Sequence, residues 1–324
     1  MNHTTLDVII PIYKPDKKFD KLLTMLLNQT IRPKRIILMN TEVFPEYSNS
    51  FVTERIQKLC RLQKVVGSDS IEIKVVSVAQ EEFDHGKTRD LGTHYSDSDI
   101  IVFMTQDAIP KDTKLLKELI SPLQNKQVVV AYARQEASMD AGLIEQYTRI
   151  FNYPNEDSIK SKEDKERLGI KTYFCSNVCA AYKRELYDEL GGFVKKTIFN
   201  EDMIFAAKAV EAGYSIAYAS KAKVIHSHNY TLMQQLRRNF DLGVSQRQYK
   251  EIFEELPSEK EGMKLVKQTL GYFVGQRHYW EVFAFIMESG FKYIGYFLGK
   301  RYTYLPQSLC QSLSMNKAYW RKYV

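Results

Sequence analysis

Carboxylate and histidine side chains follow apolar runs of this 324-residue chain. Asp107 comes just after the apolar run 100–104, and His226 and His228 come just after the short run 223–225. If the first run is a strand, Asp107 lies at its carboxyl end, where a carboxylate could hold a divalent cation against a diphosphate, and the two histidines are separate candidate ligands. Two histidines one residue apart bring both rings near one edge. The alternative for Asp107 is a turn or cap, because Asp is common before a helix.

A second segment, residues 83–90, could contact phosphate. Gly86 lets the backbone approach a ligand, and Lys87 and Arg89 could meet phosphate oxygens, Arg89 in the fork geometry of a guanidinium. This segment is therefore a candidate for binding the phosphates of a nucleotide.

A third segment could move a proton. Glu201 and Asp202 begin a predicted helix shortly after the Gly-Gly-Phe sequence 191–193. Their alternative role is to complement the positive end of the helix dipole. Hydrolysis by this carboxylate pair is disfavoured, because adjacent residues on a helix do not face each other across a substrate.

The spacing of apolar residues predicts an α/β fold that would position these groups. Residues 8–12 and 35–39 are strand-like, and residues 19–29 between them place leucines on one helical face. Such a β-α-β unit implies a mostly parallel sheet with helices on its faces, which binds ligands beyond the carboxyl ends of its strands. The other elements predicted in the first half are strands at 71–78, 100–104 and 128–133 and a helix at 112–123 that is N-capped by Asp112.

The second half is predicted to end in a helical segment. A polar loop or surface helix is expected at 152–169, followed by a strand at 172–182, helices at 184–190 and 201–212, and short strands at 215–219 and 223–225. We expect a sheet domain over 1–245 and a helical segment over 246–324, because aromatic residues recur at helical spacing after residue 264, among Lys and Arg. This segment is either a subdomain packed on the sheet domain or an amphipathic surface for anionic lipid or the acceptor.

Composition is that of a folded protein with an acidic partner. The chain is 44% hydrophobic and 26% charged, with a net charge of +7, which suits a phosphorylated small molecule, an anionic membrane surface or nucleic acid. Nucleic acid is disfavoured because no helix-turn-helix, zinc or RNP-like motif is found. Four scattered cysteines predict neither a disulfide scaffold nor a zinc site. Without a signal-peptide pattern or an apolar run long enough to span a bilayer, we expect a cytoplasmic protein, with peripheral contact to the inner face of the cell membrane left open.

In their order and spacing, the motifs resemble those of family 2 inverting glycosyltransferases with the GT-A fold. The resemblance covers about residues 6–240, and it is carried by Val8-Ile9-Ile10-Pro11-Ile12-Tyr13, Thr105-Gln106-Asp107, Leu190-Gly191-Gly192-Phe193, Glu201-Asp202 and His226. It implies a Rossmann-like, mostly parallel sheet flanked by helices, and an enzyme that uses a nucleoside-diphosphate sugar.

The resemblance also implies a role for each motif. Asp202 would be the general base, and Asp107 would bind Mg²⁺ or Mn²⁺ together with His226, with His228 as a further candidate ligand. The implied donor-binding residues are Pro11, Tyr13, Glu42, His85, Gly86, Lys87, Arg89, Gln106 and Asp107. The implied acceptor side consists of Gly192, Phe193 and Glu201.

Within that family, two segments look most like those of bacterial rhamnosyltransferases of polysaccharide and O-antigen assembly: Phe83-Asp84-His85-Gly86 followed by Thr88-Arg89, and Thr-Gln-Asp-Ala at 105–108. This predicts transfer of L-rhamnose from dTDP-rhamnose to a hydroxyl of a growing, lipid-linked cell-surface glycan. Two alternatives stay open: the same fold with a hexose or N-acetylhexosamine donor, and a non-catalytic partner in a glycan-assembly complex.

Overall fold

The structure is a computed structural model that describes residues 4–44, 46–62, 71–256 and 259–323. Within these residues, a nine-stranded sheet has the order β3-β2-β1-β4-β8-β6-β9-β5, and β7 pairs with β9. The strands are β1 (Leu6–Tyr13), β2 (Arg35–Thr41), β3 (Glu72–Val78), β4 (Ile100–Met104), β5 (Ile109–Pro110), β6 (Val128–Glu136), β7 (Ser158–Lys160), β8 (Cys179–Lys183) and β9 (Ser215–Ile225). The first three residues, on which the signal-peptide expectation rests in part, lie outside the described residues.

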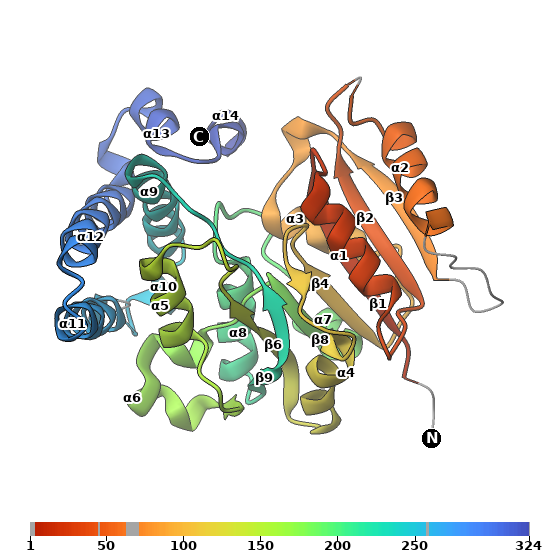
Figure 1. The fold of residues 1–324 in the computed structure, drawn as a ribbon, viewed down its shortest axis with the longest axis horizontal. Coiled ribbons are helices and arrows are strands. Elements are labelled where there is room, and N and C mark those ends of the chain that lie inside the picture. The colour runs from red at the N-terminus through yellow and green to blue at the C-terminus, as the bar shows by residue number, and fades with distance from the viewer. Residues whose placement is uncertain (1–3, 45, 63–70, 257–258, 324) are drawn as a thin grey trace.

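Helices cover both faces of the sheet, and the last helices of the chain form a layer at one end of it (Figure 1). The α-helices are α1 (Lys17–Leu27), α2 (Asn49–Leu62), α3 (His85–Thr93), α4 (Leu115–Ile120), α5 (Leu143–Asn152), α6 (Lys165–Leu168), α7 (Arg184–Glu189), α8 (Glu201–Glu211), α9 (Leu232–Gln248), α10 (Lys250–Phe253), α11 (Glu259–Gly275), α12 (Tyr279–Lys300), α13 (Gln307–Leu313) and α14 (Lys317–Tyr323). The expected α/β architecture with a helical C-terminal segment is therefore confirmed.

Most neighbouring strands are parallel, and one antiparallel strand joins the two halves of the sheet. β1 is parallel to β2 and β4, β2 is parallel to β3, and β6 is parallel to β9. β8 lies between β4 and β6 and runs antiparallel to both. The carboxyl ends of β1, β4, β6 and β9 therefore point the same way, which brings the loops after them to one edge.

The core lies on both faces of the sheet, because successive strand residues point to opposite sides. Val8 and Ile10 of β1 pack in one apolar cluster with α1, whereas Ile9 packs in the other with Phe103 of β4. Both clusters are fully enclosed, which explains why β1 and β4 appear in the sequence as unbroken apolar runs rather than as alternating ones.

Two predicted elements of the first 200 residues are corrected by the structure, and a helix covers a segment for which no element was predicted. Residues 83–90 are largely the start of α3, whose N-cap Asp84 accepts hydrogen bonds from the backbone of Gly86 and Lys87. The strand expected at 172–182 starts only at Cys179; residues 169–173 form a 3-10 helix, and their apolar side chains face the core without pairing in the sheet. The helix expected at 112–123 begins at Leu115, and Asp112 accepts from Lys114 N before it.

Two later predictions are refined. The polar stretch 152–169 contains β7 in addition to the short helix α6, and the short strands expected at 215–219 and 223–225 are one continuous β9. Residue 245, where we expected the sheet domain to end, lies inside α9. Helix α9 belongs with the C-terminal layer, because its Phe240 and Val244 share an apolar cluster with Cys310, Tyr319 and Trp320. The C-terminal segment is thus packed on the rest of the protein through α9, with its outer side left exposed.

Candidate active site

Asp107, His226 and His228 come together because two strand ends are paired. Asp107 lies between β4 and β5, and both histidines follow β9 directly. The short β5 pairs with the end of β9, with Ile109 opposite Ile225, so the loop that carries Asp107 lies beside the histidines. The structure thus places Asp107 beside His226, the two residues that the family resemblance implied as metal ligands, and beside His228, the further candidate.

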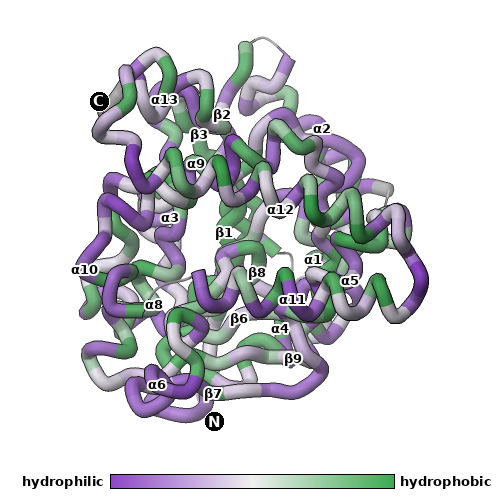
Figure 2. The backbone as a smooth tube through the Cα atoms, turned by 90° about the vertical axis from the view of Figure 1, so that its left-hand side faces the viewer, coloured by the Kyte–Doolittle hydropathy of each residue, from purple (hydrophilic) through white to green (hydrophobic). Residues whose placement is uncertain are grey.

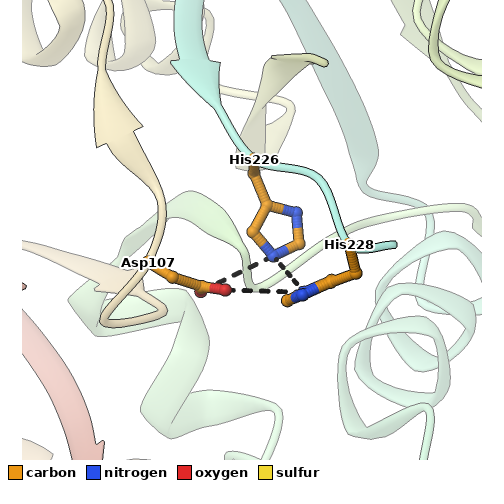
Figure 3. Close-up of side chains that lie close together, drawn as sticks. All are labelled: Asp107, His226 and His228. Carbon is orange, nitrogen blue, oxygen red and sulfur yellow. Dashed lines mark hydrogen bonds and ion pairs between the residues drawn. The ribbon is translucent and has the colours of Figure 1, made fainter. Parts of the chain in front are cut away.

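These three side chains offer one carboxylate and two imidazoles to a common point (Figure 3). Asp107 Oδ1 lies 3.6 Å from His226 Nε2, and Asp107 Oδ2 lies 3.4 Å from His228 Nε2. The two Nε2 atoms are 3.1 Å apart, and all three ligand atoms lie within 4.8 Å of one another. The arrangement is that of a candidate cation site with one oxygen and two nitrogen donors.

Gln135 of β6 fixes the ring of His226 in the orientation that a cation requires. Its Oε1 lies 3.0 Å from His226 Nδ1, and Arg149 donates to the same oxygen. Because this oxygen can only accept, Nδ1 carries the proton and the lone pair of Nε2 faces Asp107. Burial lowers the pKa of His226 to about 3, so the imidazole is neutral, which is the form that binds metal. The residues present therefore fit a divalent cation.

Glu201 and Asp202 begin α8 and differ sharply in environment. Glu201 is buried; its Oε1 lies 3.1 Å from Arg89 Nη1 and accepts a hydrogen bond from Asn177 Nδ2 at 3.2 Å. Burial alone would raise the pKa of Glu201, but Arg89, His85 and the hydrogen bond from Asn177 together outweigh burial, and the pKa is lowered. Glu201 is therefore an ionised partner of Arg89.

Asp202 is half-buried, and it has the electrostatics of a base. Its Oδ2 accepts from Asn177 N at 2.9 Å, and its Oδ1 accepts from Met203 N at 2.8 Å. Burial, followed by the negative charge of Glu201, raises the pKa of Asp202 to about 7. A carboxylate with a pKa near neutrality can take up a proton during a reaction and release it afterwards.

A short segment of chain connects this carboxylate with the cation site. Gln135 Nε2 donates to Ser176 Oγ at 2.9 Å, and the next residue, Asn177, donates its backbone N–H to Asp202. Gln135 thus forms hydrogen bonds with His226 of the cation site and with Ser176, the residue before Asn177, whose backbone N–H holds Asp202. Nothing in the sequence marks Gln135, Ser176 or Asn177, because each is an uncharged residue whose neighbours are determined only by the fold.

Several residues of the expected donor side lie at the ends of β1, β2 and β4. Tyr13 N donates to Gln106 Oε1 at 2.8 Å, and Gln106 Nε2 donates to Tyr13 O at 3.0 Å, which ties the end of β1 to the loop of Asp107. The ring of Tyr13 is exposed, and Pro11 is half-buried two residues before it. Glu42 accepts from Ser77 Oγ at 2.7 Å and Asn49 N at 2.9 Å, bonds that lower its pKa.

Other expected donor residues lie on α3, which packs against the segment before α8. A Cβ on Gly86 would lie 2.6 Å from Val194 O, so glycine is needed there for helix packing. Arg89 is buried, with Nη1 also 3.0 Å from His85 O, so its guanidinium points at Glu201. His85 and Lys87 are half-buried at the start of the same helix. The contact of Arg89 with Glu201 takes the place of the phosphate contact that we expected for it.

The expected acceptor-side residues Gly192 and Phe193 lie inside the fold. Gly192 has a φ of +62°, and a Cβ there would lie 2.5 Å from Asp90 Oδ1. Phe193 is buried, and its N–H donates to Tyr187 Oη at 3.1 Å. Their role in this structure is to shape the turn that leads to α8, which places Glu201 and Asp202.

Arg238 is a charged residue near the site that the sequence analysis did not single out. It is exposed on α9, its guanidinium lies 4.6 Å from the ring centre of Phe199, and after burial its charge contributes to the lowered pKa of both His85 and His226. It therefore presents a positive charge between the cation site and α3. Its place just after the histidine pair in the sequence was the signal that could have found it.

A groove of about 470 Å³ adjoins the cation site on the side of β6 and α5. It is lined by the end of β6, including Gln135, and by Gln146, Arg149 and Ile150 of α5, together with Ser138 and Met139 of the loop between them. The lining thus combines hydrogen-bonding groups with apolar ones, as sugar rings require.

Residues 7–191 match the family model described as glycosyl transferase family 2. The chain belongs to this family. This membership makes the protein a glycosyltransferase, as the motifs predicted, and it disfavours the alternative of a non-catalytic partner.

Two curated relatives of this glycosyltransferase are named as rhamnosyltransferases. It is 34% identical over 321 residues to the O-antigen chain rhamnosyltransferase RfbN of Salmonella typhimurium, covering 97% of this chain and 96% of RfbN. It is 40% identical over 248 residues to the O-antigen chain rhamnosyltransferase WbaN of Salmonella anatum, covering 76% of this chain and 78% of WbaN.

Solved structures confirm the GT-A fold of this glycosyltransferase. The mannosyltransferase PcManGT of Pyrobaculum calidifontis, in complex with GDP-Man and Mn²⁺, matches with a TM-score of 0.60 at 12% identity, over 91% of this chain and 87% of that one. Residues 1–349 of S. aureus TarS match with a TM-score of 0.55 at 17% identity, over 97% of this chain and 85% of that one.

Proposed function

We propose that this glycosyltransferase moves L-rhamnose, with inversion, from dTDP-rhamnose to a hydroxyl of a growing, lipid-linked O-antigen glycan. The relatives named as O-antigen chain rhamnosyltransferases support the sugar and the glycan class. The observation that carries the reaction type is a half-buried carboxylate of pKa about 7, Asp202, joined through residues 176–177 to a candidate cation site. Displacement of a diphosphate by a hydroxyl needs a base that takes the hydroxyl proton and a positive charge that stabilises the leaving diphosphate.

In this proposal Asp202 takes the proton of the acceptor hydroxyl. The two backbone N–H groups that bond to its oxygens hold the carboxylate in place, and burial, together with the negative charge of Glu201, keeps its pKa near neutrality. A base so positioned contributes about 10²- to 10⁴-fold to the rate. Arg89 acts on Glu201 and not on the substrate, so it is a positioning residue.

Asp107, His226 and His228 would hold the cation, which we propose to be Mg²⁺ or Mn²⁺. When bound, the cation neutralises negative charge on the diphosphate leaving group. Arg238 and Lys87 add positive charge on the side of α9 and α3. We propose that Tyr13, Pro11 and Glu42 bind the base and ribose, with Gln106 holding the backbone of Tyr13 and His85 completing the donor side.

We propose that the acceptor glycan enters through the groove beside Gln135, which adjoins the cation site. A lipid-linked acceptor would place the enzyme on the cytoplasmic side of the cell membrane, at its inner face. Gly192 and Phe193 contribute to this side indirectly, by placing α8.

A donor panel with purified protein tests the reaction. We expect release of the nucleoside diphosphate to depend on acceptor and on Mn²⁺ or Mg²⁺, and to occur as dTDP from dTDP-rhamnose, with no release of UDP from UDP-glucose or UDP-N-acetylglucosamine or of GDP from GDP-mannose. Turnover with a hexose or N-acetylhexosamine donor instead would leave the protein a glycosyltransferase but would contradict dTDP-rhamnose as its donor. Donor binding without turnover in any combination would favour a non-catalytic role in glycan assembly.

A further inference from the structure

Helix α12 carries a stripe of large exposed apolar side chains. Trp280 is 74% exposed and Tyr293 is 64% exposed, values far above those of core aromatics. The other exposed members of the stripe on α12 are Tyr279, Phe283, Ile286, Met287, Ile294 and Phe297. Because they recur every three or four residues, they share one face of the helix. Figure 2 looks onto this side of the molecule, where α11 and α12 face the viewer.

The opposite face of α12 is fixed to α9 by close backbone contact. A Cβ on Gly295 would lie 2.1 Å from Leu236 O, and a Cβ on Gly299 would lie 2.1 Å from Phe240 O. Gly243 of α9 makes the same kind of contact with Tyr296 O, at 2.4 Å. Only glycines permit so short an approach between two helices. The apolar stripe is therefore the outer face of a firmly held helix, and within the described residues no element covers it.

The charge of the chain is concentrated in the same region. Residues 264–324 contain nine Lys or Arg and two Glu, a net charge of +7, which equals the net charge of the whole chain. The first 263 residues contain 37 basic and 37 acidic side chains and are balanced. Exposed Arg277 precedes the stripe and exposed Arg301 follows it. The apolar face thus has an exposed arginine at each end and belongs to a segment with a net positive charge.

We propose that the outer face of α12 docks on the surface of an anionic lipid bilayer, with the helix lying in the plane of the interface. Aromatic side chains suit the boundary between headgroups and acyl chains, and Lys and Arg suit anionic headgroups. A second copy of this chain fits the face less well, because two such faces carry charge of the same sign. Among the described residues, no helix has the length and apolar character needed to cross a bilayer.

Docking in this orientation fixes the position of the active site relative to the membrane. Helix α9, which holds α12, begins just after His228 and carries Arg238. Helix α5, which lines the groove, touches α11 through Tyr147 and Tyr272, whose rings stack at 4.6 Å. The docking proposal does not depend on the donor sugar; only its link to a lipid-linked acceptor rests on the proposed function.

Sedimentation with sucrose-loaded vesicles tests the docking face. The double variant Trp280→Ser/Phe283→Ser is compared with Phe44→Ser, which removes an exposed aromatic side chain in the loop after β2. On vesicles of phosphatidylcholine with 30% phosphatidylglycerol, we expect the double variant to bind at least about tenfold more weakly than the wild type, and Phe44→Ser to bind equally well. We expect Arg277→Gln/Arg301→Gln to lose binding too, and raised salt to weaken the wild type.

Two results would overturn the proposal. Unchanged vesicle binding by the folded double variant would exclude the α12 face, and dimerisation of the wild type without lipid that is lost in the double variant would assign the face to a second copy. Circular dichroism verifies folding. Turnover of a soluble acceptor is measured on the same variants. A variant that loses vesicle binding but keeps turnover shows that docking is separate from the reaction. If neither the wild type nor any variant shows turnover, that result counts against the proposed function alone.

Discussion

Gln135 Oε1 accepts a hydrogen bond from His226 Nδ1 over 3.0 Å. Through this contact an uncharged residue of β6 determines which nitrogen of His226 is available to a cation. Replacing Gln135 with Ala should lower the affinity for Mn²⁺ about 10- to 100-fold, because the ring loses the partner that fixes its tautomer and orientation. Titration calorimetry with Mn²⁺ measures the change.

Two further variants sharpen this prediction. Gln135→Glu keeps an acceptor facing Nδ1 and should retain most of the affinity, whereas Gln127→Ala removes an exposed glutamine just before β6 and should change nothing. Equal Mn²⁺ affinity in wild type and Gln135→Ala would show that the contact does not act on the cation site.

The raised pKa of Asp202 predicts the pH dependence of transfer. A carboxyl of pKa about 7 is protonated at lower pH and cannot act as a base, so kcat/KM should fall about tenfold per pH unit below 7 and level off above it. Asp202→Asn should abolish transfer while donor binding stays near that of the wild type. Asp188→Asn, on the exposed side of α7, is the matched control.

The same pKa has a consequence for stability. Asp202 is protonated in the folded chain between about pH 4 and pH 7 but ionised in the unfolded chain, so its contribution to the free energy of unfolding falls as pH rises through this range. The slope of the free energy of unfolding against pH between pH 4 and pH 7 should be smaller in Asp202→Asn than in the wild type. Wild-type turnover, or an unchanged pH profile, in that variant would remove Asp202 from the mechanism.

Arg238 should act on the donor. Its exposed guanidinium lies near the cation site, so Arg238→Ala should raise the KM for the nucleotide sugar about tenfold or more, and Arg238→Lys should recover part of the loss. Initial-rate kinetics and dTDP binding measure both. Arg247→Ala, which removes a surface arginine of the same helix, should have no effect. A donor KM that Arg238→Ala leaves unchanged would contradict the assignment.

Arg89 should be a stability residue. Arg89→Ala leaves the buried carboxylate of Glu201 without its ion-pair partner, which should lower the free energy of unfolding by about 3–5 kcal/mol. Lys34→Ala breaks an exposed ion pair with Asp97 and should cost about 1 kcal/mol or less. Urea denaturation compares the two. If the Arg89→Ala protein is stable but binds the donor more weakly, Arg89 contacts the phosphates of the donor instead.

The strands could be predicted from the sequence because they depend on short-range patterns. β1 and β4 are apolar runs with Asp107 just beyond one of them, and the histidines follow β9 in the same way. The meeting of these side chains could not be derived from the strands, because β8 and β6 separate β4 from β9 in the sheet; the pairing of β5 with β9 brings them together, and only the family resemblance implied their shared role.

The roles of residues 83–90 and 191–193 could not be predicted in the same way. Glycine and basic side chains there have the types expected at a phosphate site, but tertiary contacts decide their use: Gly86 faces a carbonyl oxygen, and Arg89 faces Glu201. Likewise, nothing local marks Gln135, whose partners lie on β9 and in the segment before β8. Long-range pairing determines these contacts, and a single sequence does not reveal it.

Strand β8 also affects the order in which the protein can fold. It lies between β4 and β6 but follows both in the chain, so these two strands cannot be joined until residues 179–183 have been made and inserted. Contacts between distant parts of a chain form slowly, because a long loop must first be closed. Asp107 and Gln135 therefore reach their final neighbours late, and an incomplete chain emerging from the ribosome has no assembled cation site.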